Sequence, residues 1–475
     1  MITKIQKKER PTKILQFGEG NFLRAFVDYM VDVANEVTEF NGNVQIVKAV
    51  PFGSVELLEK QDCVYTVLLR GKKDGKVYVE NRAITCISGA ICAYEDYDEY
   101  AAFAKNDDLR FIVSNTTEAG IVYDESDKIE LCPPNSYPGK LTKFLYERFK
   151  ATGGSLDRGL IILPVELIDK NGQILKECCI KLADLWELPN EFKSWLTSAN
   201  TFCNTLVDRI VTGYPKDEAD ALKKDIGWDD NLIAAGEPFA LWVIETNNPK
   251  VAEEFPLDAA NLPVIFTDNL EPYRERKVRI LNGAHTASVL AAYLSNLDTV
   301  GEMMEDKTLR TFLEKIVYEE LAPMVPLPSD EVKIFADSVM ERFENPFIKH
   351  YLLSISLNST SKFKVRVLPT ILETYKKTGA LPKYLCFSFA ALIVFYTDGM
   401  RNGEPYEISD DANVLEFFAN TKSLEVEELV YNFLSKVEFW KKDLTKIPEL
   451  VGEVATALNS IRMNTMRGAV ERSIS

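Results

Sequence analysis

The chain has 475 residues, of which 46% are hydrophobic and 27% are charged, a balance typical of a globular protein with more than one domain. Its net charge of −17 argues against binding to nucleic acid or to an anionic membrane surface, because both require a cationic face. We recognise no signal peptide and no apolar run of the roughly 20 residues that a spanning helix needs, so we expect a cytoplasmic location.

The first half of the chain alternates segments of strand and helix character. Short apolar runs at 13–17 and 43–50 predict strands, and the segment 21–35 between them has apolar residues at helical spacing. Further strands are predicted at 109–115 and 158–167, and the second of these is nearly continuous in Ile and Leu, as in a strand buried on both faces. Strands separated by helices indicate βαβ units and a largely parallel sheet.

Two other regions complete the predicted organisation. The run 65–85 has two β-rich stretches around Lys72–Gly75, which predicts an antiparallel hairpin inserted in the sheet. From about Pro272 long amphipathic stretches follow one another and few strand signals remain. We therefore predict an α/β fold with a Rossmann-like dinucleotide-binding domain at 1–268 and a mostly α-helical substrate and catalytic domain at 269–475.

A glycine turn, GEGNFLRAF, lies between the first predicted strand and the first predicted helix. Gly18 permits a tight turn, Gly20 removes a side chain that would block close backbone approach, and the helix N-terminus offers N–H groups to a pyrophosphate. This order favours a dinucleotide-binding turn, although a glycine that merely ends a strand gives the same pattern. The expected cofactor contacts are Phe17, Gly18, Glu19, Gly20, Asn21, Phe22, Leu23 and Arg24.

The turn departs from the common dinucleotide fingerprint in two ways. Leu23 stands where GxGxxG has its third glycine, and the second strand ends in AVPFG without an acid for the ribose 2′-hydroxyl. Arg24 can direct charge toward the phosphates or form a structural salt bridge. The segment SNTTEAGI follows a parallel strand, so Thr117 and Glu118 are further candidates for cofactor contact, with a turn that caps the strand end as the alternative.

One of only two histidines in the chain lies in the stretch KVRILNGAHT. On an α-helix His285 would lie at about 80° and Asn282 at about 140° from Lys277, so all three project on one side. A lysine whose charge is destabilised by burial can serve as a base or proton donor, and the Asn282 amide can donate to a carbonyl oxygen. The alternative is ordinary helix packing, with a solvated lysine and asparagine and a core histidine.

The pattern KxxxxNxxH, here Lys277-VRIL-Asn282-GA-His285, resembles the active-site pattern of the mannitol dehydrogenase family of polyol-specific long-chain dehydrogenases. The similarity covers essentially the whole chain, through ILQFGEGNFLRAF, NTLVDRIV, EPFALWVIE and RFENP. It implies a Rossmann domain followed by a helical domain, NAD as cofactor and no metal. It also implies that Lys277 is the acid and base and that Asn282 polarises the reacting oxygen. His285, the third residue of the pattern, can orient the lysine or bind substrate hydroxyls. A metal site is also unexpected because the chain has no HExxH or Cys/His cluster.

Two positions depart from the polyol enzymes of that family. Leu167 stands where an asparagine of the oxyanion site is usual, and Ser354 stands where an arginine is usual. The segment LNSTSKFKVRVLP resembles a branch of the family that reduces keto sugar acids. A sugar acid needs cations for its carboxylate, and the candidates are Lys362, His350 and Arg366, each of which could instead be a charge on a helix surface.

The resemblance thus implies an NAD-dependent reductase for a small keto sugar acid in hexuronate breakdown. A reductase for a different hexuronate and a plain polyol dehydrogenase are the enzyme alternatives, and Leu167 and Ser354 argue against both. A nucleotide-dependent sensor or binding protein is the alternative of another class. The intact set Lys277, Asn282 and His285 argues against it.

Overall fold

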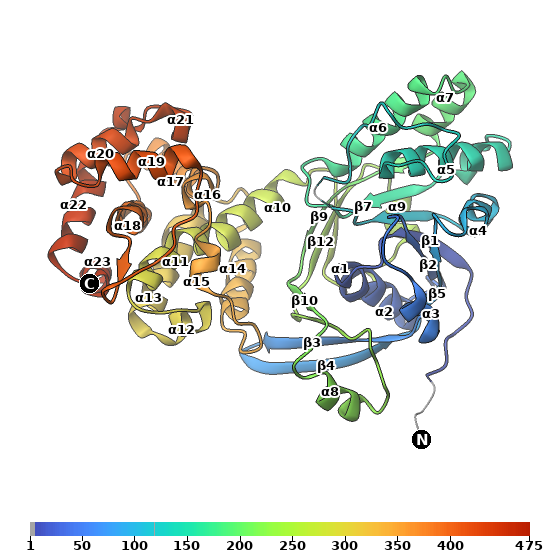
Figure 1. Cartoon of the computed structure of the whole chain (residues 1–475), viewed down its shortest axis with the longest axis horizontal. Helices are drawn as coiled ribbons and strands as arrows, with labels where there is room; N and C mark the ends of the chain where they lie inside the picture. Colours follow the sequence, from blue (N-terminus) through green and yellow to red (C-terminus); the bar gives the residue numbers. More distant parts are fainter. Residues whose placement is uncertain (1–4, 118) are drawn as a thin grey trace. The chain divides into compact units, whose positions relative to one another are not determined.

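The computed structural model of the chain describes residues 5–117 and 119–475. It divides into two compact units, Met1–Leu270 and Glu271–Ser475, which occupy the blue-to-green and the yellow-to-red parts of Figure 1. The predicted domain boundary, at 268/269, falls close to this division. No helix among the described residues is long and apolar enough to cross a membrane.

The first unit is built on a six-stranded sheet with the order β5-β2-β1-β6-β7-β8. All of its neighbouring strands are parallel. Counted along the chain, this is the order 3-2-1-4-5-6 of a Rossmann fold, so the predicted fold class is confirmed. The strands are β1 (Thr12–Phe17), β2 (Asn43–Lys48), β5 (Ile87–Cys92), β6 (Phe111–Ser114), β7 (Ile161–Pro164) and β8 (Thr201–Phe202).

Helices cover both faces of this sheet, because alternate strand residues supply two apolar layers. Ile14 packs into the layer of the first helical run, and Leu15 packs into the opposite layer. The first run consists of α1 (Asn21–Leu23), the π-helix η1 (Arg24–Asp28) and α2 (Tyr29–Val37). The other helices of this unit are α3 (Glu56–Lys60), α4 (Tyr97–Ala102), η2 (Phe103–Lys105), α5 (Tyr137–Ala151), η3 (Leu156–Arg158), α6 (Asn171–Leu185), α7 (Asn190–Ser198), α8 (Ala219–Ile226) and α9 (Lys250–Glu254).

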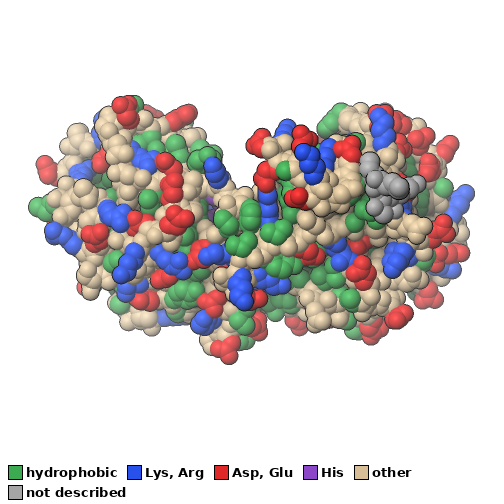
Figure 2. All heavy atoms as spheres, turned by 90° about the horizontal axis from the view of Figure 1, so that it is seen from below, with side chains coloured by type: hydrophobic (Ala, Val, Ile, Leu, Met, Phe, Trp, Pro, Cys, Tyr) green, Lys and Arg blue, Asp and Glu red, His purple; other side chains and the backbone are tan. Residues whose placement is uncertain are grey.

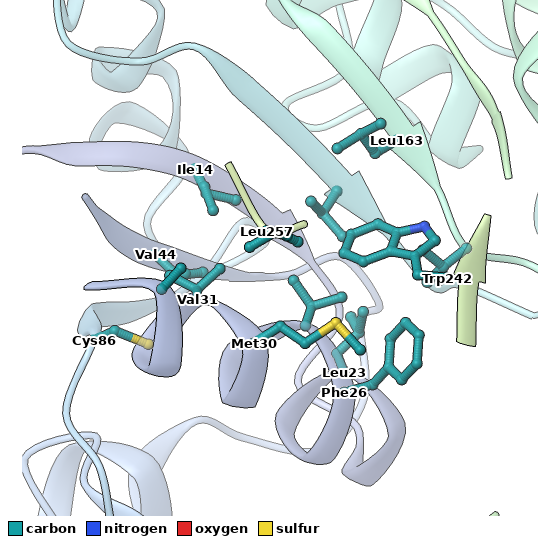
Figure 3. Packing of buried hydrophobic residues seen from close by; sticks show 14 of the residues in the cluster. Ile14, Leu23, Phe26, Met30, Val31, Val44, Cys86, Leu163, Trp242 and Leu257 are labelled. Carbon is teal, nitrogen blue, oxygen red and sulfur yellow. The ribbon is translucent and has the colours of Figure 1, made fainter. Parts of the chain in front are cut away.

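Figure 3 shows the apolar layer between the first helical run and the sheet. Leu23, Phe26 and Met30 point from the run toward the sheet, at the i, i+3, i+7 spacing of a helical face. The ring of Phe26 lies 5.5 Å from that of Trp242, centroid to centroid. This packing fixes the helix that follows the glycine turn against the sheet.

The predicted hairpin forms, but it is not inserted in the parallel sheet as we expected. Strands β3 (Tyr65–Lys73) and β4 (Lys76–Ile84) are joined by Asp74 and Gly75, both with positive φ, as tight hairpin turns require. The other edge of β3 pairs with β11 (Ala234–Gly236), so the hairpin belongs to a second sheet of order β10-β11-β3-β4. The remaining strands of the unit are β10 (Val211–Gly213), β9 (Asn204–Asp208), β12 (Leu241–Glu245) and β13 (Val264–Thr267), and the last three form a third sheet.

The second unit is mostly helical, as predicted. Helix α18 (Lys383–Asp398) is buried along almost its whole length, because its residues are apolar on every side. The other helices are α10 (Glu271–Arg276), η4 (Lys277–Asn282), α11 (Gly283–Leu294), α12 (Val300–Glu305), α13 (Lys307–Lys315), η5 (Ile316–Leu321), η6 (Ala322–Met324), α14 (Ser329–Phe343), α15 (Leu352–Ile355), α16 (Ser359–Arg366), α17 (Leu368–Thr378), α19 (Ala412–Thr421), α20 (Val426–Leu434), α21 (Val437–Trp440), η7 (Leu444–Lys446), α22 (Leu450–Met463) and α23 (Met466–Ile474). A short hairpin, β14 (Met400–Arg401) and β15 (Glu404–Pro405), completes it.

Charged side chains of both signs are interspersed over the face seen in Figure 2, and no broad basic surface gathers there. This distribution agrees with the net charge of −17. A protein that holds nucleic acid through its phosphates would present a basic stripe or patch.

Candidate active site

A cleft of about 1030 Å³ opens in the first unit at the carboxyl ends of β1, β2 and β6. In an open sheet with this strand order, dinucleotides bind at that edge. Its walls are Phe17, Gly18, Glu19, Gly20, Ala49, Val50, Phe52, Asn115, Thr116, Thr117, Ala119, Gly120, Val122, Tyr123, Asp124, Glu125, Asn135, Ser136, Tyr137 and Lys140. Five predicted cofactor residues, Phe17, Gly18, Glu19, Gly20 and Thr117, therefore line one cleft.

The glycine turn has the shape that a bound pyrophosphate requires. Gly18 has φ +127°, and its N–H donates to Val47 O at 3.0 Å, which closes the turn tightly onto β2. At Gly20, no described atom lies within 4 Å of the place where a Cβ would stand. The backbone there is open to close approach, and the first turn of the helical run begins at Asn21. These residues fit a dinucleotide, whose phosphates the N–H groups of Asn21, Phe22 and Leu23 would bind.

The side chain of Arg24 lies behind the glycine turn and does not line the cleft. It is buried, and its guanidinium donates to Glu19 O at 3.2 Å, to Asn21 Oδ1 at 2.6 Å and to Leu232 O. It also lies 5.1 Å from the ring centroid of Tyr65. Arg24 is thus placed where it holds the shape of the turn, through carbonyl and amide oxygens and not through the salt bridge that was the structural alternative.

A buried polar network continues below the turn. Gln16 Nε2 donates to Gly18 O at 3.2 Å and to Asp28 Oδ2 at 3.4 Å, and the Tyr65 hydroxyl donates to the same carboxylate oxygen at 2.6 Å. Asp28 is fully buried, and this burial raises its pKa to about 7. The side-chain oxygens Gln16 Oε1 and Asp28 Oδ1 have no hydrogen-bond partner among the described residues.

Replacing Asp28 by asparagine is expected to stabilise the protein at high pH. The pKa of Asp28 rises from an ordinary 3.8 to about 7 on folding, so its favourable contribution is complete below pH 3.8 and is lost as the pH rises to about 7. The full loss corresponds to about 4 kcal/mol. Thermal unfolding between pH 4 and pH 8 should show wild type falling below Asp28→Asn as the pH rises. Asp62→Asn, at an exposed aspartate, is the control, and parallel pH curves for Asp28→Asn and wild type would contradict the expectation.

A carboxylate that the sequence did not single out anchors the loop after β6. Glu166 Oε1 accepts from Thr116 N and Thr116 Oγ1, both at 3.0 Å, and its other oxygen accepts from Ser114 Oγ at 3.1 Å. Burial raises the pKa of Glu166. Thr117 then faces the cleft, and its carbonyl accepts from Gly120 N at 3.0 Å. Glu118, predicted beside Thr117 as a cofactor contact, lies outside the described residues.

Another wall of the cleft is the start of α5, which sequence reasoning missed. Ser136 caps this helix by accepting from Gly139 N at 2.9 Å, and Lys140 lies one turn further on. Lys140 is almost completely buried, its Nζ donates to Asn135 O at 2.6 Å, and burial lowers its pKa to about 8. The helix-start signature at Ser136 and Pro138 was visible in the sequence, but nothing local connected it to the glycine turn.

In the second unit, Lys277 and Asn282 lie on the π-helix η4, between α10 and α11. The predicted separation of about 140° assumed α-helical winding. The i→i+5 winding of a π-helix instead places Asn282 about one turn above Lys277. The angle between the two side chains around the helix axis is therefore smaller than predicted. The Asn282 carbonyl accepts from Thr286 Oγ1 at 2.9 Å. Such π segments are frequent at functional sites.

His285 follows on α11, and two rings surround it. It stacks on Phe343 with ring centroids 4.1 Å apart, and its ring meets that of His350 edge-on at 5.3 Å. Its Nε2 is buried without a hydrogen-bond partner among the described residues. Burial, followed by the charges of His350, Arg342, Arg366 and Lys362, lowers the pKa of His285 well below its usual value. His285 is therefore neutral at pH 7 and can accept or donate a hydrogen bond.

The structure brings together, around His285, the three residues that we predicted to bind the substrate carboxylate. Lys362 Nζ donates to Ile355 O at 2.9 Å, and Arg366 Nη1 reaches Thr286 Oγ1 at 3.4 Å, which ties α16 to α11. Burial lowers the pKa of Lys362, of Arg366 and of His350, and Arg366 lowers that of Lys362 further. Two crowded, partly desolvated cations, Lys362 and Arg366, favour an anionic ligand, and the neutral ring of His350 can add a hydrogen bond.

Arg342, the other cation that acts on His285, was not predicted. It lies near the end of α14, within the RFENP segment, and is only 9% exposed. From the sequence it looked like an ordinary charge on an amphipathic helix. Among the described residues, no group of three or more His, Cys, Asp or Glu side chains is arranged to hold a metal ion.

Two family models match this chain. The Rossmann domain of mannitol dehydrogenase matches residues 12–257, and the C-terminal domain of mannitol dehydrogenase matches residues 269–462. The chain belongs to the mannitol dehydrogenase family. As a member of that family, it is an oxidoreductase that acts on CH–OH groups.

Among curated members of the mannitol dehydrogenase family, the chain is similar to two altronate oxidoreductases. It is 45% identical to that of Yersinia enterocolitica, with 98% of this chain and 97% of the relative covered. It is 47% identical to that of Shigella flexneri, with 97% and 96% covered. The solved D-sorbitol dehydrogenase in substrate-free form has the same fold, at a TM-score of 0.82 and 21% identity, with 97% and 95% covered. So does the mannitol 2-dehydrogenase of Pseudomonas fluorescens, in a ternary complex with NAD and D-mannitol, at a TM-score of 0.67 and 23% identity, with 98% and 94% covered.

From the resemblance to the mannitol dehydrogenase pattern, we expected Leu167 to stand in place of an oxyanion asparagine. Its side chain is 62% exposed and has no hydrogen-bonding group. The nearby buried amide of Asn171 is committed to the backbone, because its Nδ2 donates to Pro164 O at 3.0 Å and to Glu166 O at 3.1 Å. Neither side chain can therefore act as a second hydrogen-bond donor to the reacting oxygen. Asn282 is left as the amide donor of the predicted set.

Proposed function

We propose that this chain reduces D-tagaturonate to D-altronate with NADH, reversibly, in the cytoplasmic breakdown of hexuronates. The observation that carries the proposal is the group of cations around His285, because an uncharged polyol gives no reason to gather Lys362, Arg366 and Arg342 at one place. Relatives named altronate oxidoreductase, similar over nearly the full length, support the choice of sugar acid. The glycine turn and cleft of the first unit support a dinucleotide cofactor.

The reduction needs a hydride at the ketone carbon and a proton at its oxygen. NADH, when bound, supplies the hydride. Lys277 donates the proton to the developing alkoxide, and in the reverse direction it removes the proton from the alcohol. The Asn282 amide donates a hydrogen bond to the same oxygen, where negative charge develops. Neutral His285 hydrogen-bonds a substrate hydroxyl through Nε2, and Lys362, Arg366 and His350 bind the carboxylate.

Measuring NADH oxidation with three ketones would test this proposal. The purified protein should turn over D-tagaturonate with a kcat/KM at least tenfold above that for D-fructuronate, and further above that for D-fructose. The same series with NADPH reports the cofactor preference. A preference for fructuronate or for fructose would contradict the substrate, and cofactor binding without turnover of any ketone would indicate a binding protein instead.

A further inference from the structure

Phe52 is a large, solvent-exposed apolar side chain at the wall of the cleft. It is 73% exposed and lines the cleft together with Ala49 and Val50. The chain turns sharply beside it, because Gly53 has φ +78°, a conformation that favours glycine. An aromatic ring held open at a pocket wall has a face available for a flat apolar ligand.

A buried lysine holds this ring from the side of the sheet. Lys48, the last residue of β2, is only 1% exposed, and its Nζ donates to Val50 O at 2.7 Å. The same ammonium lies 5.7 Å from the centroid of the Phe52 ring, within the range of a cation–π contact. A Cβ on Gly53 would meet Lys48 Cε at 3.4 Å, so the turn packs closely onto this side chain. The position of Phe52 is thus set by contacts that exist without a ligand.

The place of this turn in the sheet identifies the half of the cofactor that reaches it. Strand β2 lies beside β1 on the side away from β6. In a Rossmann sheet the end of this second strand faces the adenosine ribose. Phe52 comes four residues after the end of β2, so it lies on the adenosine side of the cleft.

We propose that Phe52 is the platform on which the adenine ring of the cofactor stacks. The inference rests on the dinucleotide of the proposed function and adds the residue that binds its adenine. The ring supplies an apolar surface in a cleft that offers no acid at the end of β2 for the ribose. A stacked base contributes about 1–3 kcal/mol by alanine substitution, which corresponds to about 5-fold to 150-fold in affinity.

Calorimetric titration with ADP-ribose would test this platform without any turnover. We expect Phe52→Ala to weaken ADP-ribose binding at least fivefold, and Phe52→Trp to restore it, because a larger ring still stacks. Leu57→Ala is the matched control, since Leu57 is also an exposed apolar side chain, lies five residues further on and does not line the cleft. Equal affinity of wild type and Phe52→Ala would overturn the proposal.

Kinetics with a truncated cofactor would show whether the effect is specific to adenine. Reduced nicotinamide mononucleotide has no adenosine, so the difference between Phe52→Ala and wild type should disappear with it and persist with NADH. An equal defect with both cofactors would mean that Phe52 acts through the fold, and would also overturn the proposal. Phe52-dependent ADP-ribose binding in a protein that fails to reduce tagaturonate would refute the proposed substrate and leave this inference standing.

Discussion

Lys277→Ala is expected to lower kcat for tagaturonate reduction by about 10²–10⁴, the range that a general acid or base contributes. The reason is that the alkoxide formed by hydride transfer then has no proton donor on the π-helix that carries Asn282. Binding of NADH, measured directly by fluorescence, should change little, because the glycine turn and its cleft belong to the other unit. The loss therefore concerns the chemical step and not the cofactor.

Two measurements separate proton transfer from a structural role of Lys277. Small primary amines such as methylamine should partly restore the turnover of Lys277→Ala, because an amine that enters the space left by the side chain can donate the missing proton. Lys333→Met, at an exposed lysine of α14, is the control and should behave as wild type. Near-normal kcat in Lys277→Ala would exclude the proposed mechanism.

The second large effect concerns the cations around His285. Lys362→Met and Arg366→Met are each expected to raise the KM for tagaturonate about 30-fold, which corresponds to a loss of about 2 kcal/mol for a hydrogen bond to a charged group. The KM for D-tagatose, the uncharged counterpart, should change much less. The difference in KM between tagaturonate and tagatose should therefore become smaller in these variants. Initial rates with both ketones over a range of concentrations would measure this preference.

The exposed Lys376 of α17 provides a matched control for these variants. Lys376→Met removes one positive charge from the same unit, so it shows how much of the effect comes from net charge alone. If Lys362→Met and Arg366→Met raised the KM for tagatose as strongly as that for tagaturonate, the two cations would not bind the carboxylate. The substrate assignment would then lose its main support.

Features that depend on neighbouring residues in the chain were predictable from the sequence. The order of strand, glycine turn and helix at 13–35 is local, because a helix or strand is decided largely by the spacing of apolar residues within it. The turn at Asp74 and Gly75 is local in the same way. The choice of the sheet that the hairpin joins is not a local feature, since Leu68 pairs with Ala235, which lies far along the chain.

The candidate site was predictable only in part, for the same reason. The spacing of Lys277, Asn282 and His285 placed them on one side, but it did not reveal that η4 has π winding. Arg342 has the sequence context of a surface charge, and only its burial against the histidine region reveals it. The walls of the cleft from Val122 to Lys140 come mainly from an irregular segment, which has no periodicity to interpret.

Both histidines of the chain lie in one ring contact, that of His285 with His350. Protein labelled with ¹⁵N only at histidine should therefore show the ring nitrogens of just two imidazoles, two per ring, in a nuclear magnetic resonance spectrum, without any mutation to remove others. Their shifts distinguish the protonated ring and the two neutral tautomers. The two rings are thus a spectroscopic probe of the surroundings of His285 in the intact protein. Their signals can be followed while a ligand with a carboxylate group is added.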